Sequence, residues 1–493
     1  MNKELQKLNP VLVWKHFAAM LDIPHPSHHE VAIREYFKSF AASKALDCVE
    51  DEAGNVLIRK GATAGMEDRA TIVLQAHMDM VPQKNNDTVF DFERDAVQAY
   101  VDGDWVRANG TTLGADNGIG VAAALAILED DSVAHPALEV LLTSNEECGM
   151  DGAFGLSPEL LQGEILLNLD TEDEGELCIG CAGGLDLEVK FDHEREESPK
   201  AEDGDYRAKR LTIKGLKGGH SGCQIHEQRA NANKLLFRLL RFTKLELLIS
   251  KIDGGSLRNA IPREAYADIL IHSEDEADFT DQVARFEAMV AKEYAAIEDS
   301  ISITLSDVDY PATVIEESAA SCIVWAIAGC PDGVAKMSDT MPGLVQTSSN
   351  LAIVKTSDDG TSTSVELFLR SSSESEKIAL ADSIASIFEL ADAEVTCGGS
   401  HPGWLPNIES PILKAMKDSY LELFGKEAEV RAVHAGLECG IIGATYPEMD
   451  MISFGPTIVS PHSPDECAQI STVDKFYQLL KYTLKNAPKS RKK

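Results

Sequence analysis

The sequence lacks any long apolar run. No stretch approaches the roughly 18 residues that a membrane-spanning helix needs, and the most apolar helix candidate, residues 119–128, is too short. The N-terminal residues also lack the apolar core of a signal peptide. Ten cysteines in a chain of 493 residues without an export signal are expected to be reduced thiols. We therefore expect a cytoplasmic protein that has no membrane partner.

Basic residues are also scarce. The chain has 45 Lys and Arg against 81 Asp and Glu, which gives a formal net charge of −36. A surface of this sign repels phosphate backbones, so we expect no nucleic acid partner. The hydrophobic content of 44% is typical of a globular protein. Because 493 residues exceed one ordinary hydrophobic core, the length predicts two or three domains.

Several common catalytic motifs are absent or incomplete. The sequence contains no P-loop, and no His-Glu pair has the second histidine of the H-E-x-x-H zinc motif. Residues 219–223 resemble a serine nucleophile elbow, but Cys223 occupies the position of the final glycine. Residues 118–123 nearly match a dinucleotide fingerprint, but polar residues precede them where a strand is required. The lone C-x-x-C at residues 178–181 has no partner pair, so a redox or zinc-knuckle reading lacks support.

Both terminal parts of the chain alternate strand-like and helix-like segments. Residues 71–76, 138–143 and 165–169 are apolar runs bounded by turn signals, which is typical of central strands. This alternation predicts an open α/β sheet. From about residue 187, charged strands and amphipathic helices indicate an α+β unit with an imperfect internal repeat. We therefore expect one α/β domain that is interrupted by an inserted domain at about 187–395.

Chemically useful side chains follow several of these segments. Functional groups in open α/β sheets gather at the carboxyl ends of the strands. Five motifs fit that pattern or a nearby loop, and they contain His77 with Asp79, Asp116, Glu146 with Glu147, Asp170, and His462. Taken singly, each could be a structural histidine or a solvated acid. The acidic residues that follow Asp170, at positions 172–176, are interpreted as solvent-exposed.

Together these residues predict a metal centre. Two histidines and three carboxylates, with one further acid, provide the nitrogen and oxygen ligands that zinc accepts. In hydrolases with two metals, the ions lie roughly 3.5–4 Å apart and can share a ligand. A carboxylate such as Asp79 on the second nitrogen of His77 would fix the tautomer of that histidine.

Four longer segments carry a resemblance to a known family. Residues 74–88, 218–222, 257–265 and 434–440 are similar to those of the zinc aminoacylase and carboxypeptidase family of co-catalytic metallopeptidases. The resemblance covers nearly the whole chain. It implies an α/β fold with a mixed-sheet zinc-peptidase catalytic domain and an inserted α+β lid domain. The implied boundaries are 1–186 and 396–493 for the catalytic domain and 187–395 for the lid.

The resemblance also implies a role for each metal ligand. It assigns His77 and Asp170 to one metal, and Glu147 and His462 to the other. Asp116 would bridge the two ions. The expected cofactors are two divalent metal ions per chain, with Zn²⁺ as the default and Co²⁺ or Mn²⁺ as alternatives.

Five further residues receive roles in the same way. Asp79 would orient His77, and Glu146 would act as the general base. On the lid, His220 would stabilise the transition-state oxyanion. Arg370 would bind the substrate carboxylate, and Asn259 is a second candidate for that pocket.

The implied reaction is the hydrolysis of dipeptides. Within the family, the resemblance is to members that cleave Xaa-His dipeptides, including β-alanyl-histidine (carnosine), and it implies a homodimer. Two other activities in the family remain open, a tripeptide aminopeptidase and an N-acyl amino acid deacylase. A non-catalytic binding protein on the same fold is the alternative from a different functional class.

Overall fold

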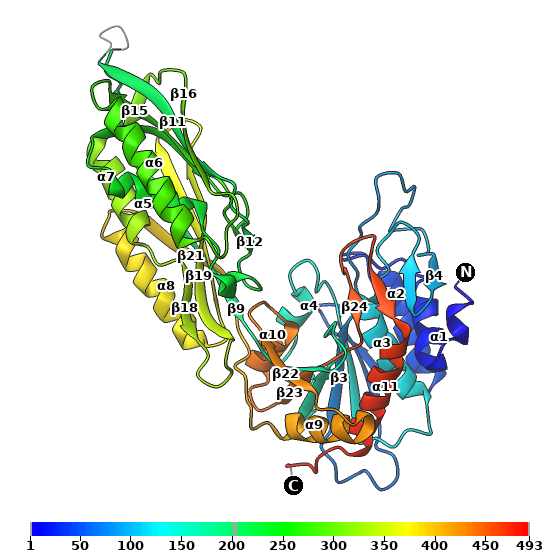
Figure 1. The fold of residues 1–493 in the computed structure, drawn as a ribbon. Helices are drawn as coiled ribbons and strands as arrows, with labels where there is room; N and C mark the ends of the chain where they lie inside the picture. Colours follow the sequence, from blue (N-terminus) through cyan, green and yellow to red (C-terminus); the bar gives the residue numbers. More distant parts are fainter. Residues whose placement is uncertain (1, 201–204, 492–493) are drawn as a thin grey trace. The chain divides into compact units, whose positions relative to one another are not determined.

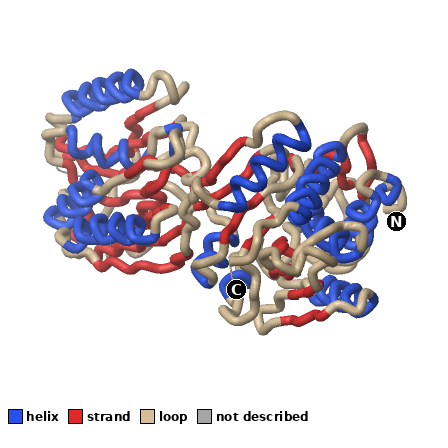
Figure 2. The backbone as a smooth tube through the Cα atoms, turned by 90° about the horizontal axis from the view of Figure 1, so that it is seen from below, coloured by secondary structure: helices blue, strands red, loops and turns tan. Residues whose placement is uncertain are grey.

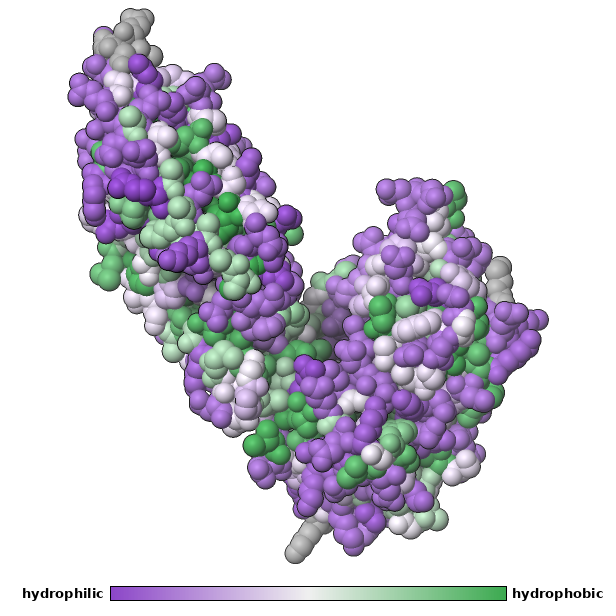
Figure 3. Space-filling model, in the orientation of Figure 1, coloured by the Kyte–Doolittle hydropathy of each residue, from purple (hydrophilic) through white to green (hydrophobic). Residues whose placement is uncertain are grey.

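The computed structural model describes residues 2–200 and 205–491 of the chain, which forms two compact units. The first unit contains three segments, Met1–Gly180, Trp404–Ala432 and Leu437–Lys493. The second contains Cys181–Gly403 and Val433–Gly436. In Figure 1 the first unit is blue to cyan and orange to red, and the second is mainly green to yellow. On the visible face in Figure 3, hydrophilic residues cover most of both units, as the strongly acidic composition predicts.

The first unit is built on a mixed eight-stranded sheet with the order β1-β2-β6-β3-β7-β23-β8-β22. Its four central strands pair in parallel, while β1 pairs antiparallel with β2, β2 with β6, and β8 with β23. The parallel strands are β3 (Ile72–His77), β6 (Leu138–Thr143), β7 (Ile165–Asn168) and β23 (Asp450–Ser453). The other strands are β1 (Asp47–Glu50), β2 (Val56–Lys60), β8 (Glu176–Cys181) and β22 (Glu429–Val433).

The apolar runs predicted as central strands are buried on both faces. Every residue of β3, β6 and β7 is buried, which explains why these strands are continuous in apolar residues rather than alternating. The covering helices are α1 (Val11–Met20), α2 (Val31–Ser43), α3 (Ala115–Glu129), α4 (Asp151–Phe154), α9 (Pro411–Phe424), α10 (Glu438–Thr445) and α11 (Ile470–Lys485), with the short η1 (Leu5–Lys7). Helices and strands of the chain are distinguished by colour in Figure 2.

Helix α3 is placed by close packing against the sheet and α1. It is buried along nearly its whole length and contacts α1, β3 and α11. A Cβ atom added at Gly120 would lie only 2.6 Å from the backbone oxygen of Leu169, just after β7. Only glycine permits this approach, which fixes the start of α3 next to the carboxyl ends of the parallel strands.

A small antiparallel sheet supports the late part of the first unit. Its order is β24-β25-β5-β4, with β4 (Ala99–Asp102), β5 (Trp105–Ala108), β24 (Ile458–Val459) and β25 (Cys467–Gln469). It therefore brackets the loop that carries His462. The sequence did not predict β4 and β5, because each has four residues and is only half-buried or alternately buried.

The second unit is dominated by one antiparallel sheet, with β16-β11-β15-β13-β19-β20-β9-β21 in order and β18 paired to β19. Helices α5 to α8 lie on one side of it (Figure 1). The strands are β9 (Gly183–Asp192), β11 (Tyr206–Lys214), β13 (Leu247–Gly254), β15 (Ala265–His272), β16 (Ser302–Asp307), β18 (Gly333–Met337), β19 (Val345–Thr356), β20 (Ser362–Ser371) and β21 (Glu394–His401). The helices are α5 (Ala232–Phe242), α6 (Glu276–Glu293), α7 (Glu317–Gly329) and α8 (Glu374–Glu389).

The described residues of the second unit also form two short strand pairs and a 3-10 helix: β10 (Arg195–Glu197) with β17 (Thr313–Ile315), β12 (Gly219–His220) with β14 (Ala260–Ile261), and η3 (Ile225–Glu227). The unit has its own core, formed by residues from the sheet and from α5 to α8. The predicted fold class, an α/β protein with mixed sheets, is confirmed. Among the described residues, no helix has both the length and the apolar character that a membrane span requires.

Candidate functional site

The carboxyl ends of β3, β6 and β7 lie side by side in the first unit. His77 ends β3 and pairs in register with Thr143 at the end of β6, while Gln75 pairs with Asn168 at the end of β7. The loops that follow β6 and β7 carry Glu146, Glu147 and Asp170. The parallel register therefore brings these side chains to the same edge of the sheet as His77.

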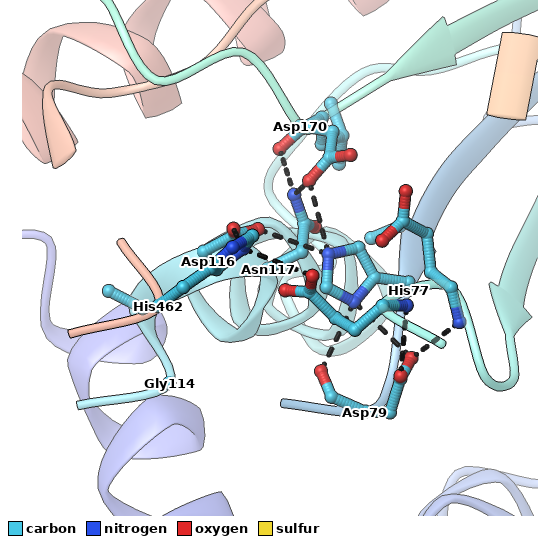
Figure 4. Close-up of polar contacts among 12 residues, drawn as sticks. His77, Asp79, Gly114, Asp116, Asn117, Asp170 and His462 are labelled. Atoms are coloured by element: carbon cyan, nitrogen blue, oxygen red, sulfur yellow. Dashed lines mark hydrogen bonds and ion pairs between the residues drawn. The ribbon is translucent and has the colours of Figure 1, made fainter. Parts of the chain in front are cut away.

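His77 is the residue at which most of the site meets. Its side chain is 1% exposed, and its Nε2 lies 3.0 Å from Asp116 Oδ1 and 3.4 Å from Asp170 Oδ1 (Figure 4). On its other side, Nδ1 lies 3.1 Å from the backbone oxygen of Asp79 and 3.4 Å from Asp79 Oδ1. The Asp79 contacts favour a proton on Nδ1, which leaves Nε2 free to face the two carboxylates.

Asp116 lies between the two histidines. Its Oδ1 is 3.0 Å from His77 Nε2, and its Oδ2 is 3.2 Å from His462 Nε2. His462 Nε2 is also 3.0 Å from Glu147 Oε2. One carboxylate thus contacts a nitrogen from β3 and a nitrogen from a loop near the end of the chain, which is the geometry expected of a bridging group.

Three groups of side chains in this region have ligand atoms close enough to hold a metal ion. Within each group, one atom per residue lies within 4.8 Å of the others. The groups are His77, Asp116 and Asp170; His77, Glu146 and Glu147; and Asp116, Glu147 and His462. All supply imidazole nitrogen and carboxylate oxygen, which are zinc ligands.

The charges at this site favour a bound cation. Burial raises the pKa of Asp170 and of Glu147, although neighbouring histidines oppose the shift. Hydrogen bonds to Asp116 and Glu147 raise the pKa of His462 to about 11. Burial opposes protonation of His77, but Asp170 and Asp116 outweigh it and raise the pKa of His77 well above its usual range. The carboxylates thus draw protons onto both imidazoles, and divalent cations would neutralise the same charge.

An unpaired atom supports the same conclusion. Glu147 Oε1 is buried and has no hydrogen-bond partner within the part of the chain that the structure describes. A buried carboxylate oxygen without a partner is costly, and a metal ion would satisfy it. The residues present therefore fit a metal centre in both ligand type and arrangement.

Asp79 organises the loop that carries the two glutamates. Its Oδ1 accepts a hydrogen bond from Glu146 N at 3.0 Å, and its Oδ2 accepts one from Glu147 N at 3.2 Å. Ser27 Oγ donates to Asp79 Oδ2 at 2.7 Å. Burial raises the pKa of Glu146 well above its usual range. Asp79 thus fixes His77 and the Glu146 backbone at the same time.

Four residues of the site received no role from the sequence. Asn117 Nδ2 donates to Leu169 O at 3.0 Å and also contacts Asp170 Oδ1. Glu438 Oε2 accepts hydrogen bonds from Gln75 at 2.6 Å and Thr143 at 2.8 Å, below the strand ends. The other two are Ser27 and Glu466. Glu438 lies in the segment 434–440 that carries the family resemblance, and Glu466 comes four residues after His462. Only the fold shows that both side chains are buried.

The interpretation of residues 172–176 as solvent-exposed acids is wrong for most of them. Among the acids of this segment only Asp173 is exposed. The Glu174 side chain is 9% exposed and pairs with Lys475 at 3.3 Å. Burial raises the pKa of Glu172 to about 8, helped by the charge of Asp116. The turn after Asp170 folds back onto the first unit, which the local acidity of the sequence did not reveal.

The second unit brings the two predicted lid residues together. His220 Nε2 lies 3.4 Å from a terminal nitrogen of Arg370. His220 Nδ1 accepts hydrogen bonds from the backbone N–H groups of Gly222 and Cys223, at 3.1 and 3.0 Å. Burial and the charge of Arg370 lower the pKa of His220, which favours a neutral imidazole, and the two backbone donors at Nδ1 favour the tautomer with its proton on Nε2.

Arg370 and Asn259 differ in their surroundings. Arg370 is 5% exposed, its guanidinium lies 4.6 Å from the centre of the Phe368 ring, and its Nε has no partner among the described residues. Asn259 is exposed, and its backbone oxygen accepts a hydrogen bond from Ser221 N at 2.8 Å. Arg370 is therefore a buried cation with capacity for an anionic ligand, while Asn259 supports the loop next to His220.

Comparison with known proteins gives consistent results. The sequence matches peptidase family M20/M25/M40 over residues 73–486. It is 44% identical to the cytosol non-specific dipeptidase of Escherichia coli (strain K12) over 487 residues, which cover 98% of this chain and 99% of the relative. The crystal structure of aminoacylhistidine dipeptidase from Vibrio alginolyticus superimposes with a TM-score of 0.94 at 43% identity, covering 99% of this chain and 98% of that one.

A more distant structure shares the fold. A tripeptidase from Staphylococcus aureus matches with a TM-score of 0.55 at 17% identity, over 97% of this chain and 98% of its own. The family match extends over most of the chain, and the E. coli relative is similar over nearly its full length. The chain therefore belongs to peptidase family M20/M25/M40.

Proposed function

We propose that this protein hydrolyses dipeptides with the help of two divalent metal ions. The proposal rests on five side chains whose ligand atoms lie close together at one edge of the first unit's sheet: His77, Asp116, Glu147, Asp170 and His462. The full-length similarity to two dipeptidases supports the substrate class. An Xaa-His dipeptide such as carnosine is the specific substrate that we propose, in line with the name of the V. alginolyticus relative.

The proposed ligand assignment follows the contacts. His77 and Asp170 would hold one ion, Glu147 and His462 the other, and Asp116 would contact both. Bound ions of this kind act as Lewis acids and lower the pKa of water. We propose zinc as the native metal, because imidazole and carboxylate suit it, although Co²⁺ or Mn²⁺ would also fit.

Glu146 is the proposed general base. Glu146 precedes the proposed ligand Glu147 in the sequence. One oxygen of its carboxylate lies within 4.8 Å of ligand atoms of His77 and Glu147. Glu146 would take the proton from the attacking water and return it to the leaving amine. Its backbone N–H is fixed by Asp79, so the carboxylate is positioned before the substrate binds. The presence of this base argues against a non-catalytic binding protein.

Residues of the second unit would act on the scissile carbonyl and on the free carboxylate of the substrate. We propose that the second unit, Cys181–Gly403 with Val433–Gly436, corresponds to the lid domain that the sequence predicted at 187–395. The first unit would correspond to the catalytic domain predicted at 1–186 and 396–493. Neutral His220 would donate from Nε2 to the developing oxyanion. Arg370 would bind the free carboxylate of the substrate, with Asn259 as a neighbour of that pocket. A charged pair of this kind selects substrates whose carboxylate lies a fixed distance from the scissile bond.

A substrate panel tests the proposed function. The metal-loaded protein should hydrolyse carnosine and other dipeptides faster than tripeptides or N-acetyl amino acids, as measured by release of the C-terminal amino acid. A dipeptide whose carboxylate is converted to an amide should show a KM about 10- to 100-fold higher, because it loses a charge-assisted contact with Arg370. If the protein hydrolysed N-acetyl amino acids faster than every dipeptide, it would be a deacylase instead.

His220 can be tested separately from the metal ligands. His220→Ala should lower kcat by about 10²-fold or more through loss of an oxyanion donor, while bound metal stays at the wild-type level. His226→Ala is a matched control, because His226 is an exposed histidine in the same segment. Metal analysis and steady-state kinetics give the two readouts. Loss of metal from His220→Ala would contradict the proposed role.

Two properties of the protein outside the site are also proposed. We infer that it is cytoplasmic, in line with its expected reduced thiols and with the name of the E. coli relative. We infer that it is a homodimer, as the family resemblance implies. Light scattering of the purified protein would test the second inference directly.

A further inference from the structure

Glu466 holds the turn from which α3 begins. Its side chain is 2% exposed. Its Oε2 accepts hydrogen bonds from the backbone N–H groups of Leu113 and Gly114, at 2.7 and 3.0 Å. Its Oε1 accepts hydrogen bonds from the N–H groups of Ala115 and Asp116, at 2.7 and 3.2 Å. Four consecutive N–H groups therefore share one buried carboxylate.

This turn has little other support from regular helix hydrogen bonds. The first N–H groups of a helix have no partner within the helix. Gly114 has the left-handed φ of 72°, and Asp116 has φ −80° and ψ 109°, so neither is helical. The Glu466 carboxylate supplies the acceptors that this irregular backbone lacks. Because Asp116 donates one of the four bonds, its backbone position depends directly on Glu466.

Glu466 also belongs to the loop that carries His462. Its own N–H donates to Ser463 O at 3.0 Å, which closes a tight turn after His462. Ser460 and His462 both have left-handed φ values, 55° and 58°, so the backbone is irregular at the histidine and two residues before it. One side chain therefore joins the loop of His462 to the turn of Asp116, although the two lie about 350 residues apart in the sequence.

We propose that Glu466 is a positioning residue that sets the spacing between Asp116 and His462 and so controls metal affinity. This inference rests on the proposed function, because it takes these two residues as metal ligands. Glu466 does not contact the metal; it acts through the backbone of Asp116 and through its own loop. Replacing a residue that holds a metal ligand in place without contacting the metal typically changes metal affinity or activity by about 10- to 100-fold.

Glu466→Gln is the sharpest variant, because it keeps the shape of the side chain. Its amide nitrogen would face two N–H donors that now meet an acceptor oxygen, so two of the four hydrogen bonds are lost. Glu466→Ala would lose all four. The metal-free proteins would be titrated with Zn²⁺ in competition with a chelating indicator. Co²⁺-loaded proteins would be compared by visible absorption, which reports ligand geometry without any substrate.

The expected result is a metal dissociation constant raised about 10- to 100-fold for Glu466→Gln, more for Glu466→Ala, and an altered Co²⁺ spectrum. At saturating metal, kcat of Glu466→Gln should recover toward the wild-type value. If Glu466→Ala does not fold, Glu466→Gln alone carries the test, since it retains two hydrogen bonds.

Glu139→Gln is the matched control. Glu139 is also 2% exposed and accepts two backbone hydrogen bonds, from Gln162 and Gly163, both at 2.9 Å. It lies near the start of β6, at the opposite end of the strand from Glu146. Glu139→Gln should lower the melting temperature without changing metal affinity. If Glu466→Gln behaves in the same way, Glu466 is only structural and the proposal is overturned. Failure of the wild-type protein to bind metal would overturn the proposed function instead.

Discussion

Glu146→Gln is expected to lower kcat by about 10²–10⁴-fold, the usual contribution of a general base and proton shuttle, with no loss of bound metal. The amide cannot accept a proton from the attacking water, but it keeps the size of the side chain. The backbone contact of residue 146 with Asp79 is also kept. Steady-state kinetics on a dipeptide and metal analysis of the same sample measure both effects.

The control for Glu146 is an acid of the same type outside the site. Glu159→Gln alters an exposed glutamate in the same unit and should leave kcat and metal content unchanged. Near-normal activity of Glu146→Gln would remove Glu146 from its proposed role. A loss of metal in that variant would mean that Glu146 is a ligand rather than the base.

Asp116→Ala should have the largest effect on metal binding of any single substitution. Asp116 contacts His77 through one oxygen and His462 through the other, so its loss removes a ligand from both proposed ions. We expect the metal content to fall below one ion per chain after dialysis, and activity to be lost with it.

His462→Ala provides the comparison for Asp116→Ala. The side chain of His462 is 50% exposed and contacts Asp116 and Glu147. His462 would therefore be a ligand of one ion, the ion that it shares with Glu147. This variant should keep the ion held by His77 and Asp170. Equal metal loss in the two variants would contradict the bridging position of Asp116, as would full retention of metal in Asp116→Ala.

The parts of the fold that the sequence predicted are those with strong local patterns. The apolar runs at 138–143 and 165–169 correspond to β6 and β7, and the apolar helix at 119–128 lies within α3. Burial on both faces makes such segments continuous in apolar residues. The short strands β4 and β5 lack this signal, since they are partly exposed. They pair with each other, and β5 also pairs with β25 from much later in the chain.

The site shows the same division between local and distant information. His77, Asp170 and Glu147 follow apolar runs and could be suspected from position alone. Glu466 could not, because its partners are backbone N–H groups at the start of α3, which any sequence would provide. The roles of His220 and Arg370 came from family resemblance, since their contact joins β12 to β20 across the second unit.

Anomalous X-ray diffraction from crystals of the zinc-loaded protein would show directly whether two metal ions share Asp116. We expect two peaks per chain, one next to His77 and Asp170 and one next to Glu147 and His462, each about 2.0–2.2 Å from an oxygen of Asp116. A single peak, or peaks that lie away from these side chains, would contradict it.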